Sequence, residues 1–153
     1  MRITDTAICL TVEDVTSSSA FLARHFGYGE TMAADGFASL SHPDGPNVIF
    51  VRRGLEVLPE GLREQRAAGV LLAFTVADLP AEYERLRAEG VPIVMEPRVE
   101  PWGERVFLVS DPNGVIIEVV DWVETPGATA DTAGSAEAAG SAEAAGTATA
   151  TAP

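Results

Sequence analysis

One carboxylate inside an apolar segment has the clearest capacity for chemistry. Glu118 interrupts the apolar run 115–120, and strand alternation places it on one face while its immediate neighbours face the other way. A carboxylate there can accept a proton, hold a metal ion or bind a cationic group. It can equally be paired internally with Arg52 or Arg105, because an unpaired buried carboxylate is costly. Both interpretations stay open from sequence alone.

The thiol and the imidazoles offer weaker prospects for chemistry. Cys9 is the only cysteine, which excludes an intrachain disulfide. A nucleophilic cysteine needs a base beside it, but His25 lies at an expected helix end and His42 in an expected turn. We therefore interpret Cys9 as a small buried apolar side chain that points into the expected cleft. The two histidines are assigned to helix termination and turn hydrogen bonding.

These side chains must be positioned by the strands and helices that residue periodicity indicates. Alternation from Ala7 to Val12 predicts a strand, and a helix with Asp14 or Thr16 as its N-cap follows and ends at Gly27. Three more strands are expected at 30–34, 36–41 and 47–53. The second half repeats this plan, with a strand at 70–76, a helix at 79–89 and strands near 92–100, 104–110 and 115–121.

Two sequence motifs recur at nearly constant spacing. Val12-Glu13-Asp14 before the first helix returns as Val76-Ala77-Asp78 before the second. The turn Ser41-His42-Pro43-Asp44-Gly45 returns as Ser110-Asp111-Pro112-Asn113-Gly114, each leading into an apolar strand. The chain is therefore expected to hold two copies of one module, at 1–53 and 70–123, joined by a connector at 54–69 with a short helical pattern.

The V-x-D motif before each helix and the S-D-P-x-G turn before an I-E strand resemble the glyoxalase/bleomycin resistance/dioxygenase (vicinal oxygen chelate) superfamily. The resemblance covers about residues 3–123. It implies an α+β fold of paired βαβββ modules, whose curled mixed sheets form a cleft, and a homodimer. Members include metal-dependent isomerases and dioxygenases as well as metal-free drug-sequestering proteins.

The family's metal positions decide between those branches. Carried onto this sequence, they fall on Ala7, Leu71, Phe50 and Glu118, and a slip of one residue would replace Phe50 by Ile49. Only Glu118 can donate to a metal, whereas a tight divalent site needs at least three protein ligands. The resemblance therefore implies no metal cofactor, with a divalent metal as the alternative.

The expected cleft is mainly apolar, with few polar groups, which is typical of a small-molecule pocket. Trp102, beside a glycine in a hairpin, is expected to project over the cleft mouth as a stacking surface. The predicted ligand-binding residues are Cys9, Phe37, Phe50, Arg52, Trp102, Glu118 and Trp122.

Composition excludes several classes of partner. The 153 residues carry 10 basic and 23 acidic groups, a net charge of −13, which disfavours nucleic acid. No apolar run approaches the roughly 20 residues that span a bilayer, and the start shows no export signal, so we expect a cytoplasmic protein without a membrane partner. Residues 124–153 are rich in Ala, Thr and Gly and lack an apolar face, so a disordered tail is expected.

These observations favour metal-independent binding of a small aromatic or cationic molecule, as in antibiotic sequestration. The alternative is an enzyme of the same superfamily, a lyase, isomerase or dioxygenase, with Glu118 as its acid or base. No other residue is a catalytic candidate.

Overall fold

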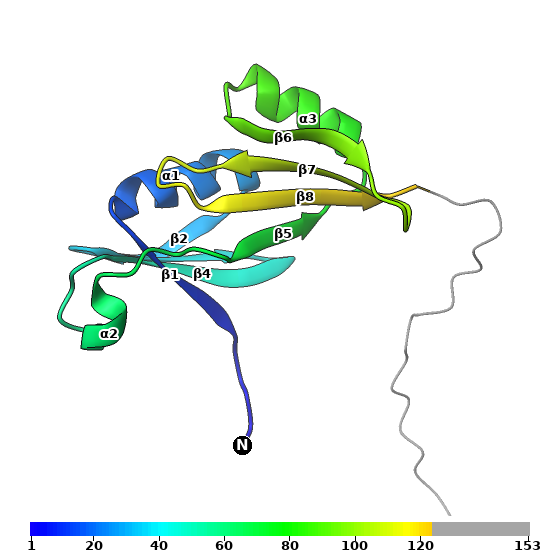
Figure 1. Ribbon diagram of the computed structural model, residues 1–153. Helices are drawn as coiled ribbons and strands as arrows, with labels where there is room; N and C mark the ends of the chain where they lie inside the picture. Colours follow the sequence, from blue (N-terminus) through cyan, green and yellow to red (C-terminus); the bar gives the residue numbers. More distant parts are fainter. Residues whose placement is uncertain (124–153) are drawn as a thin grey trace, which may run out of the picture.

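The computed structural model describes residues 1–123, arranged as two four-stranded sheets that each carry one long helix (Figure 1). The tail expected at 124–153 lies outside these residues. The first sheet comprises β1 (Ala7–Val12), β2 (Gly29–Ala34), β3 (Phe37–His42) and β4 (Gly45–Arg52), with α1 (Val15–Phe26) after β1. Its strand order is β1-β4-β3-β2, with β1 parallel to β4 and the other pairs antiparallel.

The second sheet repeats the first. It comprises β5 (Leu71–Thr75), β6 (Ile93–Val99), β7 (Glu104–Ser110) and β8 (Ile116–Trp122), with α3 (Leu79–Ala88) after β5. Its order β5-β8-β7-β6 again joins a parallel pair to antiparallel ones. The predicted α+β class is confirmed, and each expected strand and long helix is present within a few residues. The connector forms only a single short helix, α2 (Glu60–Arg63).

Capping residues fix both ends of α1. The Asp14 carboxylate accepts a hydrogen bond from the Ser17 backbone N–H at 3.1 Å, so Asp14 and not Thr16 is the N-cap. Gly27 ends the helix with a φ of 72°, in the left-handed region that glycine enters without strain. In the second module Asp78 caps α3 in the same way, through the Ala81 N–H.

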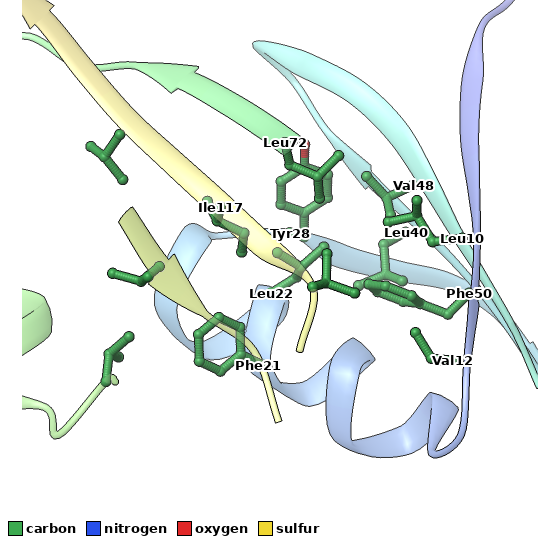
Figure 2. Packing of buried hydrophobic residues seen from close by; sticks show 14 of the residues in the cluster. Leu10, Val12, Phe21, Leu22, Tyr28, Leu40, Val48, Phe50, Leu72 and Ile117 are labelled. Atoms are coloured by element: carbon green, nitrogen blue, oxygen red, sulfur yellow. The ribbon is translucent and has the colours of Figure 1, made fainter. Parts of the chain in front are cut away.

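One hydrophobic core serves both modules. Leu22 of α1 packs with Leu40 and Phe50 of the first sheet, and Leu72 and Ile117 of the second sheet belong to the same cluster (Figure 2). The helix-facing sides of both sheets therefore contribute to one shared core together with the helices. Their other sides face outward, and these outward faces carry the remaining strand residues.

Polar contacts join the modules at the start of α1. The Asp111 carboxylate accepts a hydrogen bond from the Ser18 hydroxyl and further bonds from the backbone N–H groups of Asn113 and Val115, at 2.9 and 2.7 Å. The Asn113 amide donates to the Asp14 carbonyl oxygen at 2.7 Å. The turn before β8, in the second module, therefore holds the N-terminal end of α1, which belongs to the first module.

A second set of contacts joins the C-terminal ends of the two helices. His25 Nδ1 lies 2.5 Å from a carboxylate oxygen of Glu89, and Arg85 donates to the His25 carbonyl oxygen at 2.9 Å. Arg85 also donates to Glu82 and Glu89 of its own helix. The assignment of His25 to a structural role at a helix end therefore agrees with its contacts.

Asp121 is the second carboxylate with several internal partners. It is 4% exposed, it accepts hydrogen bonds from the Arg105 guanidinium, and it accepts one from the Leu79 N–H at 3.0 Å. Burial opposes ionisation of this group, but the bonds from Arg105 and Leu79 outweigh burial and hold the pKa of Asp121 below its usual value.

We expect Asp121→Asn to lower the free energy of unfolding at neutral pH by about 1.5–3 kcal/mol. Because the folded pKa is depressed, the ionised group stabilises the protein above the unfolded value of about 3.9, and this contribution disappears as the pH falls through the folded pKa. Urea unfolding of both proteins across acid pH should therefore show the two stabilities converging below about pH 4. A constant difference across this range would contradict the assignment.

Candidate ligand-binding surface

Glu118 lies on the outward face of the second sheet. Strand pairing places it opposite Ala73 of β5 on one side and Leu108 of β7 on the other, so all three side chains share that face. This is the face on which alternation in the sequence placed Glu118. Val106 and Val120 lie on the same face and are nevertheless buried. Neighbouring side chains therefore cover this part of the face.

The Glu118 carboxylate is half-buried and has no hydrogen-bond or ion-pair partner among residues 1–123. The two arginines considered as internal partners are used elsewhere, since Arg52 pairs with Asp35 and Arg105 with Asp121. No buried side-chain oxygen or nitrogen in this part of the chain lacks a partner, so the Glu118 oxygens reach solvent. The carboxylate is therefore available to a ligand.

Two tryptophans and a second carboxylate lie at one end of this face. Trp102 is 64% exposed, and its indole N–H donates to the Glu104 carboxylate at 2.8 Å. Glu104 is paired directly with Trp122, which is 57% exposed, across β7 and β8. The Val123 N–H donates to the Gly103 carbonyl oxygen at 2.9 Å, which holds the Trp102 loop against the end of β8.

Sequence reasoning missed Glu104. Its position two residues before Val106 and four before Leu108 puts it on the Glu118 face by alternation, and this signal was present in the sequence. The contact with Trp102 was not readable in the same way, because it depends on the path of the 100–103 turn.

The outward face of the first sheet carries Cys9 and Phe37. Cys9 is paired with Ile49 in β4, and Phe37 with Val51. Burial raises the pKa of the Cys9 thiol, so the thiol stays protonated at neutral pH and is a poor nucleophile. As a whole residue Cys9 is nevertheless exposed rather than buried, because it lies on the outward face of β1, and its part in ligand binding stays a prediction.

The predicted placements of Phe50 and Arg52 are wrong. Phe50 is 1% exposed and points into the core beside Leu22 (Figure 2), because β4 pairs with β1 so that Ile49, not Phe50, shares a face with Cys9. Arg52 pairs with Asp35 at the far end of the sheet, in a bidentate contact at 2.7 and 3.0 Å. Neither residue belongs to the outward surface.

The residues at the family's metal positions do not form a metal site. With Ile49 in place of Phe50, the four positions are Ala7, Ile49, Leu71 and Glu118, and the first three have no donor atom. Among residues 1–123 no group of three His, Cys, Asp or Glu side chains is arranged to hold a metal ion. A second copy of the chain would bring the same four residue types, so the donor set does not fit a divalent metal.

Residues 5–119 match the family model described as the Glyoxalase/Bleomycin resistance protein/Dioxygenase superfamily. The chain belongs to this superfamily. A comparison with curated proteins finds no match.

Solved structures show the same fold. A glyoxalase/bleomycin resistance protein/dioxygenase from Nocardioides is 28% identical, with a TM-score of 0.67 over 83% of this chain and 89% of that one. TioX from Micromonospora is 23% identical, with a TM-score of 0.61 over 79% and 100% of the two chains. A superfamily member from Sphaerobacter thermophilus is 20% identical, with a TM-score of 0.61 over 78% and 97%.

Within residues 1–123, none of the helices combines the length and the apolar character needed to cross a membrane.

Proposed function

We propose that this protein binds a small aromatic cation on the outward face of its second sheet and holds it without chemical change. The observation that carries the proposal is the half-buried Glu118 carboxylate, which has no partner within residues 1–123 and shares a face with the end at which Trp102 and Trp122 are exposed. In the cell such a protein would sequester its ligand, as in antibiotic resistance by binding, and would act in the cytoplasm.

The residue types on this face suit that ligand class. A tryptophan face attracts a cation by about 0.5–2 kcal/mol, and a flat aromatic ligand also gains by stacking on it. Glu104 adds negative charge beside the tryptophans, and Glu118 adds it four residues further along the same face of β8, roughly 13 Å from Trp122 at the rise of a strand. The charge of the whole chain, −13, favours the approach of a cation. The apolar neighbours Ala73 and Leu108 offer the remaining contact surface.

A homodimer would complete the cleft. Glu118 does not line any of four cavities, of about 310 to 770 Å³, that open on residues 1–123. Large apolar side chains are exposed on both outward faces, including Met32 on the first sheet and Leu71 on the second. We infer that the first sheet of one copy, with Cys9 and Phe37, faces the second sheet of another copy and encloses the ligand between them.

Proflavine, a planar aromatic cation, provides a probe of this surface. We expect Trp102→Ala to weaken proflavine binding by roughly 1–3 kcal/mol without unfolding the protein, because Trp102 is exposed and supports no core contact. Titrations monitored by the change in tryptophan fluorescence would measure the effect. Unchanged affinity in the folded variant would remove Trp102 from the binding surface.

The enzyme alternative predicts a different outcome for the ligand. Candidate substrates incubated with the protein should be recovered intact if it is a binding protein. A product whose formation stops in Glu118→Gln would instead identify Glu118 as an acid or base.

A further inference from the structure

A cavity of about 770 Å³ lies where the two modules meet, and of the ligand surface described above it shares Ala73. Its walls come from the C-terminal end of α1, the turn between β3 and β4, strand β5 and helix α3. Its volume falls in the range of small-molecule sites, about 300–1,000 Å³. Neither Glu118 nor either tryptophan lines it.

One side of this cavity is a continuous row of aromatic rings. Phe26 and Phe74 have ring centroids 5.5 Å apart, Phe74 and Tyr28 are 6.0 Å apart, and Tyr28 and His42 are 5.2 Å apart. Phe26 and Phe74 come from different modules and are only half-buried, so their exposed ring surface faces the cavity. A flat ring can pack against this row.

Two hydrogen-bond donors at the same cavity have no partner within the described residues. The guanidinium of Arg24 makes no ion pair or hydrogen bond in residues 1–123, although Arg24 lines the cavity. His42 Nδ1 accepts a hydrogen bond from the Asp44 backbone N–H at 3.1 Å, so the ring proton of neutral His42 is on Nε2. That Nε2–H is therefore a second donor.

Within residues 1–123, the acidic side chains at this cavity do not form hydrogen bonds with Arg24 or with His42 Nε2. Glu82 is bound by Arg85 at 2.6 Å, and Arg85 is held in turn by Glu89 and by the His25 carbonyl oxygen. The Asp44 side chain is exposed on its turn, where water solvates it. The donors still without a partner suit an anionic acceptor, and a carboxylate takes charge-assisted hydrogen bonds from groups of this kind.

We propose that this cavity is a second small-molecule site and that it takes a planar aromatic carboxylate. The carboxylate binds Arg24 and the Nε2–H of His42, and the ring lies against Phe26 and Phe74. Because the walls come from both modules, an occupied site links the modules and stabilises the folded protein by mass action.

Three fluorinated probes of nearly equal shape test the proposal by fluorine NMR: para-fluorobenzoate, para-fluorobenzamide and para-fluorobenzylamine. We expect the benzoate to bind with a dissociation constant on the order of a millimolar, as suits a ligand of about ten heavy atoms. The neutral amide and the cationic amine should bind at least about tenfold more weakly. Equal binding of the three probes, stronger binding of the amine, or no binding of the benzoate would overturn the proposal.

Variants locate the site. Arg24→Gln and His42→Gln should each weaken benzoate binding about three- to tenfold. Arg87→Gln is the matched control, since Arg87 is an exposed arginine in the last turn of α3 and does not line the cavity. Arg24 is exposed, so its replacement does not endanger folding. Equal losses of benzoate affinity in Arg24→Gln and Arg87→Gln would overturn the proposed site. Trp102→Ala should leave benzoate binding unchanged, which separates this site from the ligand surface on the second sheet.

Discussion

Asp111→Ala should lower the free energy of unfolding by about 3–5 kcal/mol. The Asp111 side chain is buried, with the residue 5% exposed, and it accepts hydrogen bonds from the Ser18 hydroxyl and from the Val115 and Asn113 N–H groups. Its removal leaves these donors without their acceptor at the junction of the two modules, and each unsatisfied buried donor costs about 1–3 kcal/mol.

Chemical unfolding would measure this loss, and Asp44→Ala supplies the control. Asp44 belongs to the corresponding turn of the first module, but it is exposed. Its replacement should change stability by no more than about 0.5 kcal/mol. Equal effects of the two substitutions would contradict the role given to Asp111 in joining the modules.

Phe50→Ala is the second substitution with a large expected effect. It should lower the free energy of unfolding by about 3–5 kcal/mol, because the ring is fully buried in the shared core (Figure 2). Ile49→Ala, one residue earlier, should cost clearly less, because Ile49 lies on the outward face and is only half-buried. Thermal or chemical unfolding of the two variants compares the faces of β4 directly. A larger loss for Ile49→Ala would show that Phe50 faces the ligand surface after all.

The contrast between β4 and β8 shows how far alternation carries a sequence-based prediction. In β8 the polar Glu118 marks which residues face outward, so the outward residues of β8 and of its parallel partner β5 were predictable. In β4 the run Val48-Ile49-Phe50-Val51 is apolar on both faces. Only pairing with β1 fixes which residues face the core, and that pairing is tertiary information.

The elements were predictable because their signals are local. Asp14 and Gly27 mark the ends of α1 through capping chemistry that acts within a few residues. The contacts between modules were not predictable in this way: Ser18 and Asp111 are 93 positions apart, and neither residue type is unusual where it stands. The partners of Arg52 and Arg105 likewise depend on strand register, so the availability of Glu118 could be established only from the structure.

Calorimetric titration of proflavine and acridine against the wild type and Glu118→Gln tests the central claim most directly. Near neutral pH proflavine is a cation and acridine is largely neutral, while both present the same ring system. If Glu118 recognises the cation, the variant should lose about 1.5–3 kcal/mol of affinity for proflavine and much less for acridine, because glutamine keeps the shape and removes the charge. Equal losses for both ligands, or none for proflavine, would contradict the account.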